Sequence, residues 1–177
     1  RQYHYHGAAH LLGYLSEASP NDLKRDSTIM RGDFVGRSGV ERTYEEVLRG
    51  TKGEEIFYRD ARGRIQGRLD GGAHDRAPVS GKDLTLSIDA GLQALGERMM
   101  KGKRGAIVAI EPETGEILAM VTAPNYDPVL LSGKSKGENH RALEETFGKP
   151  LLNRAIQGNY PPGSTFKAAQ GAIFLAE

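Results

Sequence analysis

The order of apolar and polar positions along the chain predicts short elements in its first part. Residues 19–25 begin with Ser-Pro-Asn-Asp, in which Ser is expected to cap a short helix and Pro to take its first position. Residues 38–50 place apolar side chains on one helical stripe after a capping-box sequence, and Gly50 is expected to end that helix. Residues 55–59 and 64–65 flank an Ala-Arg-Gly turn, which predicts a small hairpin.

Beyond a polar, glycine-rich stretch at residues 69–81, the best candidate for a linker, the pattern changes to longer elements. Residues 83–88 alternate polar and apolar side chains, which predicts a half-buried strand. Residues 89–102 begin with a capping Asp, carry apolar side chains that face one way, and end with Gly, so they are expected to form a helix. Residues 105–110 and 116–121 are continuous apolar runs joined by Pro-Glu-Thr-Gly, which predicts a hairpin.

The last third of the chain is less regular. Residues 125–150 are polar with little periodicity and are expected to form a long loop, and residues 151–156 to form a short helix. Residues 164–177 are apolar nearly all round, which is typical of a helix buried on every side. Because little sequence remains to bury that helix, we expect the fold to continue beyond Glu177.

Together these elements predict an α+β fold in two parts, a pedestal at residues 1–80 and an incomplete C-terminal lobe at residues 81–177. A length of 177 residues and a hydrophobic fraction of 38% suit a folded, soluble chain. The net charge of +1 and the scattered Lys and Arg residues give no reason to expect nucleic acid. The absence of cysteine excludes disulfides, thiol catalysis and thiolate metal sites. No apolar run approaches about 18 residues, so the sequence contains no transmembrane helix.

The most informative motif is Tyr-Pro-Pro-Gly-Ser-Thr-Phe-Lys at residues 160–167. Ser164 and Lys167 are nearly one helical turn apart, so their side chains are expected on one face. A neutral amine beside a hydroxyl can take its proton, which makes the oxygen a nucleophile towards an acyl carbon. The positive end of the helix dipole disfavours the charged form of such an amine. The alternative is that Ser164 only caps a helix, since Ser-x-x-Lys occurs by chance about once in a few hundred residues.

Three histidines near the start of the chain raise the question of a metal site. His4 and His6 would share one face of a strand, and His10 follows closely. No carboxylate or fourth ligand lies at a recognisable spacing. Packing is therefore the favoured interpretation, and neither a metal nor another cofactor is expected.

Taken together, these segments resemble a class B penicillin-binding protein of the elongation type. The Gly-Asp-Phe-Val-Gly-Arg-Ser-Gly-Val-Glu sequence that begins at Gly32 is similar to the family's pedestal signature. The Ala-Ile-Val-Ala-Ile-Glu-Pro-Glu-Thr-Gly sequence that begins at Ala106 is similar to the first hairpin of its transpeptidase domain. The stretches that carry the resemblance, all in family order, are residues 32–50, 61–64, 84–93, 106–121 and 153–167.

The resemblance implies that Ser164 is the acyl-accepting nucleophile and Lys167 its general base in a peptidoglycan D,D-transpeptidase. The substrate would be a D-Ala-D-Ala stem peptide, and β-lactams would acylate the same serine. The family's Ser-x-Asn and Lys-Thr-Gly motifs do not follow Lys167 here, and the strand that completes the oxyanion hole is missing too. We therefore expect this chain alone to be inactive towards penicillin.

The resemblance also implies a place in the cell and partners. The protein would be anchored in the bacterial inner membrane with its domains on the periplasmic side, the anchor lying outside this chain. Membrane polymerases and cell-shape scaffold proteins would be its partners.

Three other interpretations remain open at this point. A serine β-lactamase also uses Ser-x-x-Lys, but it has no pedestal ahead of the catalytic domain, and hydrolytic turnover of a β-lactam would favour it. A β-lactam sensor shares the catalytic fold but would follow membrane helices. The chain could also be a non-catalytic interaction module, which a pull-down set beside an acylation assay would distinguish from an enzyme.

Overall fold

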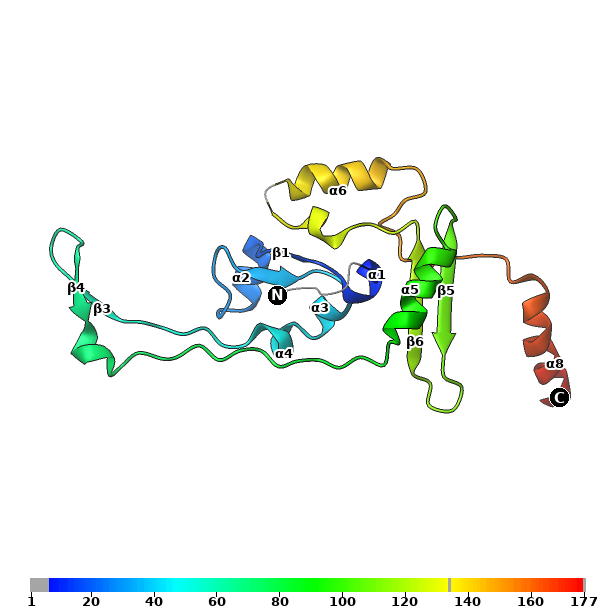
Figure 1. The fold of residues 1–177 in the computed structure, drawn as a ribbon, viewed down its shortest axis with the longest axis horizontal. Helices are drawn as coiled ribbons and strands as arrows, with labels where there is room; N and C mark the ends of the chain where they lie inside the picture. Colours follow the sequence, from blue (N-terminus) through cyan, green and yellow to red (C-terminus); the bar gives the residue numbers. More distant parts are fainter. Residues whose placement is uncertain (1–6, 134, 177) are drawn as a thin grey trace.

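The computed structural model describes residues 7–133 and 135–176, which form an elongated molecule of helices and strands (Figure 1). The compact part of the pedestal lies near its centre, a thin arm extends to one side, and the C-terminal lobe lies on the other. The mixed helix and strand architecture is the class that the sequence predicts.

The pedestal is built from short elements joined by tight turns. Strand β1 pairs antiparallel with β2, and this pairing places the buried side chains of Ser16 and Val35 opposite each other. In chain order the elements are α1 (Ala9–Leu12), β1 (Leu15–Glu17), α2 (Pro20–Arg25), β2 (Phe34–Gly36), α3 (Gly39–Thr43), α4 (Glu45–Arg49), β3 (Phe57–Arg59), β4 (Ile65–Arg68) and the 3-10 helix η1 (Leu69–Gly72).

Helix α2 begins and ends where the sequence predicts. The Ser19 Oγ accepts a hydrogen bond from the backbone N–H of Asp22 at 3.3 Å, and Asp22 Oδ2 accepts one from the N–H of Ser19 at 2.7 Å. Pro20 takes the first helical position, where its missing N–H would have no partner in any case. The backbone N–H groups of Ser19 and Asp22 thereby both have acceptors, and the predicted helix is confirmed.

The helix predicted over residues 38–50 is two helices, α3 and α4, and the predicted capping box at its start is wrong. The backbone leaves the helical region at Tyr44, where φ is −110° and ψ is 23°. The Ser38 side chain makes no capping hydrogen bond. Just after the break, a Glu45 carboxylate oxygen accepts a hydrogen bond from the N–H of Gly36 at 2.8 Å, a contact that apolar periodicity does not signal. Gly50 ends α4 with φ 73°, as predicted.

The end of α1 packs directly against the start of α3, and two glycines make this possible. A Cβ atom on Gly13 would overlap the carbonyl oxygen of Ser38, and one on Gly39 would overlap the carbonyl oxygen of Leu11. Both glycines also have positive φ, 86° and 57°. Helix α1 is therefore held close to the pedestal core.

The arm, residues 51–80, is a long antiparallel excursion that ends in the predicted hairpin of β3 and β4 (Figure 1). Gly63, with φ 76°, supplies the turn. The returning strand follows the outgoing one through single bridges between Thr51 and Val79 and between Glu54 and Arg76. The stretch predicted as a linker is thus partly paired and includes the 3-10 helix η1.

The C-terminal lobe centres on one helix packed on one hairpin. Strands β5 and β6 pair antiparallel across the predicted turn, where Gly115 has φ 77°. Helix α5 is capped by Asp89, whose Oδ1 accepts a hydrogen bond from the N–H of Leu92 at 2.8 Å, as predicted. The elements are α5 (Ala90–Met99), β5 (Gly105–Ile110), β6 (Ile117–Ala123), the 3-10 helix η2 (Pro128–Leu131), α6 (Lys136–Glu145), α7 (Arg154–Gln157), the 3-10 helix η3 (Gly163–Phe166) and α8 (Lys167–Ala176).

Two expectations for this lobe are wrong. The exposure of residues 83–88 alternates as expected, but they are not a strand and form no ladder with another described strand. Two hydrogen bonds join the end of this segment to β6. The Ser87 Oγ donates to the carbonyl of Ile117 at 2.9 Å, and the N–H of Asp89 donates to the carbonyl of Leu118 at 2.9 Å. The long loop expected at residues 125–150 contains η2 and α6.

Physical reasons account for the missed and shifted helices. Helix α6 has no buried residue, so no apolar stripe marks it, and its surface carries a pair between His140 and Glu144 at 3.5 Å, one turn apart. The short helix expected at residues 151–156 is α7, shifted towards the C-terminus. It starts only at Arg154 because residues 149–152 form a turn. In this turn the N–H of Leu152 donates a hydrogen bond to the carbonyl of Lys149 at 3.1 Å.

A buried polar side chain joins α5 to β6. Gln93 is 1% exposed, its Oε1 accepts a hydrogen bond from the N–H of Met120 at 2.8 Å, and its Nε2 donates to the carbonyl of Met120 at 3.1 Å. Its side-chain amide thus pairs with β6 as a neighbouring strand would. Gly96 allows the close approach, since a Cβ there would come within 2.9 Å of Val121 Cγ2.

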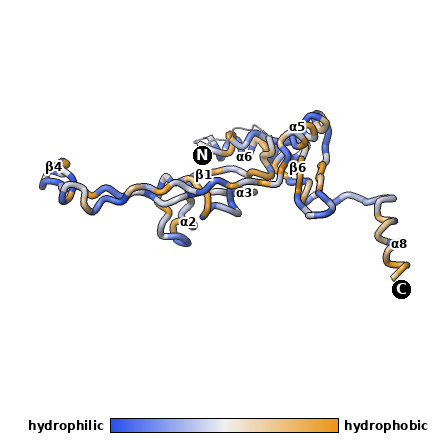
Figure 2. Tube along the Cα trace, turned by 60° about the horizontal axis from the view of Figure 1, so that its bottom comes forward, coloured by the Kyte–Doolittle hydropathy of each residue, from blue (hydrophilic) through white to orange (hydrophobic). Residues whose placement is uncertain are grey.

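The face of α5 that packs on β6 is therefore not its apolar stripe. Leu92, Leu95 and Met99, which the sequence places on one side, are 38%, 44% and 55% exposed. Figure 2 shows hydrophobic residues in α5 and in the hairpin beside it. The hydrogen bonds of Gln93, rather than apolar periodicity, set the rotation of this helix.

We predict that Gln93→Leu destabilises the 177-residue chain, because the leucine keeps the volume but leaves two buried backbone groups of Met120 without partners. Each unpaired group costs about 1–3 kcal/mol. Urea unfolding monitored by circular dichroism measures the change. Gln170→Leu, at an exposed position of α8, is the control and should leave the free energy of unfolding nearly unchanged; equal stability of the two variants would contradict the role assigned to Gln93.

A second prediction concerns acid. The Arg37 guanidinium, 2.8 Å from the Asp22 carboxylate, and then the Ser19 hydroxyl hold the pKa of Asp22 well below its usual range. A lowered pKa in the folded state contributes stability that is complete above the unfolded pKa of about 3.9 and is lost as the pH falls towards the folded value. Asp22→Asn should therefore lower stability at neutral pH and flatten its fall below about pH 4.

The measurement for this second prediction is urea unfolding of both proteins across a pH series. Asp83→Asn, at an exposed position, is the matched control, and it should follow the unsubstituted protein. An acid dependence of Asp22→Asn as steep as that of the control would count against the ion pair with Arg37.

Candidate functional site

The motif at residues 160–167 forms the helical turn that the sequence predicts. Gly163 has φ 58°, and η3 begins at this residue and runs directly into α8. The N–H of Lys167 donates to the carbonyl of Ser164, and the Thr165 Oγ1 donates to the carbonyl of Pro162 at 2.6 Å. Ser164 and Lys167 therefore lie one turn apart in consecutive helical segments.

The two side chains are exposed and not joined to each other. Among the described residues no hydrogen bond links the Ser164 hydroxyl to the Lys167 amine, and both residues are solvent-exposed. The structure thus brings the two residues into one helical turn without closing a nucleophile–base contact. Such contacts are often long when a site is empty, so this geometry is compatible with the predicted roles.

Helix α8 is exposed along its described length, contrary to the burial that its composition predicts. Phe174 and Leu175 are 77% and 91% exposed. The helix stands away from the rest of the molecule (Figures 1 and 2), and its hydrophobic residues have no described segment packed on them. The apolar composition of α8 suits a helix that other parts of a protein cover, and the described residues provide no such cover.

The approach to this turn is fixed by a buried arginine. Arg154 is 6% exposed and donates from Nη2 to the carbonyl of Gly148 and from Nη1 to those of Lys149 at 3.1 Å and Leu152 at 3.4 Å. Lys149 has φ 46°, a left-handed conformation that a residue with a side chain adopts only at a cost. One guanidinium therefore holds the turn that precedes α7.

A second anchor joins α7 to β6. The Thr122 Oγ1 donates to Oδ1 of Asn153 at 3.1 Å and accepts from the N–H of Ala155 at 3.3 Å. Thr122 itself is buried in β6. The sequence resemblance includes Asn153, Arg154 and Ala155, but sequence reasoning gave them no structural role. The one available signal was a charged residue, Arg154, in the short, mostly apolar run from Leu151 to Ile156.

The pedestal contacts the lobe at two points along α1. The N–H of Ala8 donates to Oε1 of Glu97 on α5 at 2.6 Å. The His10 Nε2 lies 2.8 Å from the carbonyl oxygen of Pro150, and its ring meets that of Tyr126 edge-on, with 5.0 Å between centroids. Burial raises the pKa of Tyr126 to about 12. These contacts place a pedestal helix against the segment that leads to Ser164.

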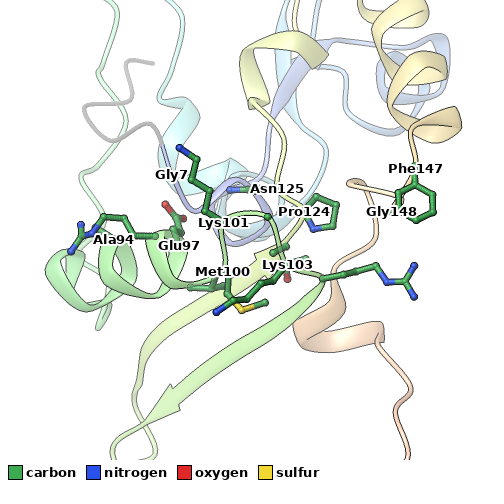
Figure 3. Close-up of a pocket in the computed structure, with 16 residues that line it drawn as sticks. Gly7, Ala94, Glu97, Met100, Lys101, Lys103, Pro124, Asn125, Phe147 and Gly148 are labelled. Carbon is green, nitrogen blue, oxygen red and sulfur yellow. The ribbon is translucent and has the colours of Figure 1, made fainter.

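A cavity of about 800 Å³ lies between the end of α5, the end of β6 and residues 147–148 (Figure 3). Figure 3 shows Glu97 and Lys101 on the α5 side, with Pro124 across from them. Neither Ser164 nor Lys167 lines it, so the cavity is not where these two side chains would act.

The structure describes one of the three histidines near the start of the chain, His10. His10 is engaged by Pro150 and Tyr126, while His4 and His6 lie outside the described residues. Across residues 7–133 and 135–176, no group of three or more His, Asp or Glu side chains is placed to hold a metal ion. In the same part of the chain no helix combines the length and apolar character needed to cross a membrane.

Comparison with protein families supports the two-part organisation in chain order. Residues 1–86 match the family model described as the penicillin-binding protein dimerisation domain. Residues 105–177 match the penicillin-binding protein transpeptidase domain.

Among curated proteins, similar relatives are peptidoglycan D,D-transpeptidases named MrdA. That of Acinetobacter baumannii is 42% identical over 170 residues, which are 94% of this chain and 25% of the relative. That of Escherichia coli K12 is 37% identical over 175 residues, 94% of this chain and 27% of the relative. The chain thus spans about a quarter of the length of these relatives.

Solved structures share the fold. Penicillin-binding protein PBP2 of Helicobacter pylori, in a complex with MreC, superposes with a TM-score of 0.80 at 33% identity, over 96% of this chain and 31% of that one. PBP2 of Pseudomonas aeruginosa, in complex with WCK 5153, gives a TM-score of 0.72 at 39% identity, over 93% of this chain and 32% of that one.

We predict that Arg154→Met loosens the approach to Ser164, because methionine has a similar reach and no donors for the carbonyls of the turn. The loss should be about 1–3 kcal/mol for each carbonyl left buried and unpaired. Limited proteolysis should show faster cleavage within residues 147–158, alongside a lower free energy of unfolding. Arg141→Met, on the exposed surface of α6, should change neither; similar protection of both variants would contradict the anchoring role.

Proposed function

Because the chain belongs to the penicillin-binding protein family, we propose that it carries the pedestal and the nucleophile-bearing turn of a peptidoglycan D,D-transpeptidase. The observation that carries the proposal is the helical turn in which Ser164 and Lys167 stand three positions apart, within the segment that matches the transpeptidase domain. We also propose that the pedestal ends at residue 80 and that the transpeptidase part begins at residue 81.

The chemistry would be acyl transfer through Ser164. Its Oγ attacks the carbonyl carbon between the two D-Ala residues of a stem peptide, while the neutral amine of Lys167 accepts the hydroxyl proton. The C–N bond then breaks, and the departing D-Ala amine takes up a proton. An amine of a second stem peptide attacks the acyl-enzyme, forms the cross-link and restores the hydroxyl of Ser164.

The start of the helix contributes to stabilising the intermediate. The first N–H groups of a helix have no acceptor within it, so the backbone N–H of Ser164 would be free to donate to the oxyanion. The positive end of the helix dipole also favours negative charge there. In this family the second oxyanion donor comes from a later strand, which this chain does not supply.

Activity therefore requires more protein than these residues. The relatives are about four times as long as the matched region, and α8 exposes apolar side chains that suit a covered helix. We infer that the rest of a transpeptidase domain covers α8 and completes the site, and that this chain alone is inactive.

Partners and place in the cell follow from the same proposal. The solved complex of Helicobacter pylori PBP2 with MreC supports a cell-shape scaffold protein as a partner. We infer that the pedestal makes this contact and that a membrane polymerase is a further partner. The arm offers exposed apolar side chains for such contacts, Phe57, Tyr58 and Ile65 among them. The protein would act on the periplasmic side of the bacterial inner membrane, with β-lactams as acylating inhibitors.

Labelling with a fluorescent penicillin tests this function in a protein that extends the chain to the length of its relatives. We expect stoichiometric labelling that Ser164→Ala abolishes and that Lys167→Met slows by about 10²–10⁴, the usual worth of a general base. The 177-residue chain alone should label at least about 10²–10³ more slowly, the usual cost of one oxyanion donor.

The control for this labelling is Ser132→Ala, another serine of the lobe, which should label normally. Labelling that survives Ser164→Ala would refute the assignment of the nucleophile. Rapid hydrolytic turnover of the penicillin would instead favour a β-lactamase.

A further inference from the structure

We propose that His10 is a positioning residue through which the pedestal sets the place of Ser164. The juxtaposition that carries this inference is His10, on pedestal helix α1, against the carbonyl of Pro150, in the segment that leads to Ser164. The inference rests on the proposed function, because it concerns the nucleophile of that reaction.

The contact itself is directional. The His10 Nε2 lies 2.8 Å from the Pro150 oxygen, and a carbonyl oxygen only accepts, so Nε2 carries the proton and donates. The edge-on contact with Tyr126, at an interplanar angle of 89°, fixes the plane of the ring. Burial, together with the charge of Arg154, lowers the pKa of His10 although the carbonyl contact opposes this, so the ring is neutral near pH 7.

Helix α1 gives His10 a fixed base. Its first turn is tied to α5 by the hydrogen bond from Ala8 to Glu97, and Ala9 is buried at 1% exposure. Its end is packed against α3 through Gly13 and Gly39, where no side chain would fit. The backbone that carries His10 is therefore tied to both α5 and α3.

The segment that receives the contact is also fixed. Pro150 follows Lys149, whose carbonyl is held by Arg154, and precedes Asn153, which is held by Thr122. From the end of α7 at Gln157 only residues 158–163 lead to Ser164, and two prolines restrict their backbone. The position of Pro150 therefore helps to set where the chain leaves α7 for Ser164.

Hydrogen bonds between the pedestal and this segment are few. A cavity of about 320 Å³ separates them beside His10, with Tyr14 and Ser38 on the pedestal side and Leu151 and Ile156 on the other. Among hydrogen bonds between described residues, that of His10 to Pro150 is the one that links the pedestal to residues 147–176. The link therefore depends on a single donor.

The test measures Ser164 acylation by fluorescent penicillin in the protein extended to the length of its relatives, separating initial affinity from the acylation rate constant. His10→Phe keeps an aromatic ring but lacks the donor, and we expect its acylation rate constant to fall about 10- to 100-fold, as for a small misplacement of a reacting group. His10→Gln keeps an N–H donor and should recover most of the rate. His74→Phe, on the exposed arm, should behave as the unsubstituted protein.

Two outcomes would overturn the inference while leaving the proposed function standing: unchanged acylation in His10→Phe, or equal loss in His10→Phe and His10→Gln, which would mean packing rather than donation. Absence of Ser164-dependent acylation in the unsubstituted protein would overturn both. If His10→Phe does not fold, His10→Gln and His10→Met, alike in length and different in the donor, give the same comparison.

Discussion

The interaction on which the arrangement depends is the hydrogen-bond network of the buried Gln93 and the half-buried Glu97. The amide of Gln93 pairs with both backbone groups of Met120, and its Nε2 also donates to Glu97 at 3.0 Å. The same Glu97 oxygen accepts from the N–H of Ala8 at the start of α1. The start of α1, helix α5 and strand β6, which are far apart in the chain, are thus joined through the side chains of Gln93 and Glu97. Because buried polar groups are costly when left unpaired, the network fixes how α5 lies on β6 and where the pedestal begins.

Local chemistry explains which elements the sequence could predict. Caps at Ser19 and Asp89 and the turn glycine Gly115 act through neighbouring residues, and their sequence signals predicted them correctly, unlike the capping box expected at Ser38. Helix α6 has no buried face, and the helical stripe breaks at Tyr44, just before Glu45 contacts Gly36. Such features depend on the surface of the whole helix or on a distant strand, and periodicity does not record either.

The candidate site divides in the same way. The turn that carries Ser164 and Lys167 follows from a proline-glycine sequence and an apolar helix, so it could be predicted. The residues that hold the segment before this turn are harder to predict: His10 contacts the carbonyl of Pro150, 140 positions along the chain, and Arg154 donates to carbonyls of the preceding turn. Nothing in a run of residue types shows which carbonyl a buried donor will reach. The sequence therefore predicted the two side chains proposed to carry the reaction. The structure adds the contact between the pedestal and the segment that precedes them.

The central claim is that a rigid junction of pedestal and lobe supports a nucleophile-bearing helix that needs further protein to cover it. Hydrogen–deuterium exchange of the 177-residue chain tests this most directly. The account predicts that the amides of Ala8 and Met120, both donors to the buried network, exchange slowly and together, while those of α8 exchange almost as fast as in an unfolded chain. Protection of α8 equal to that of Met120, or rapid exchange at Ala8, would contradict it.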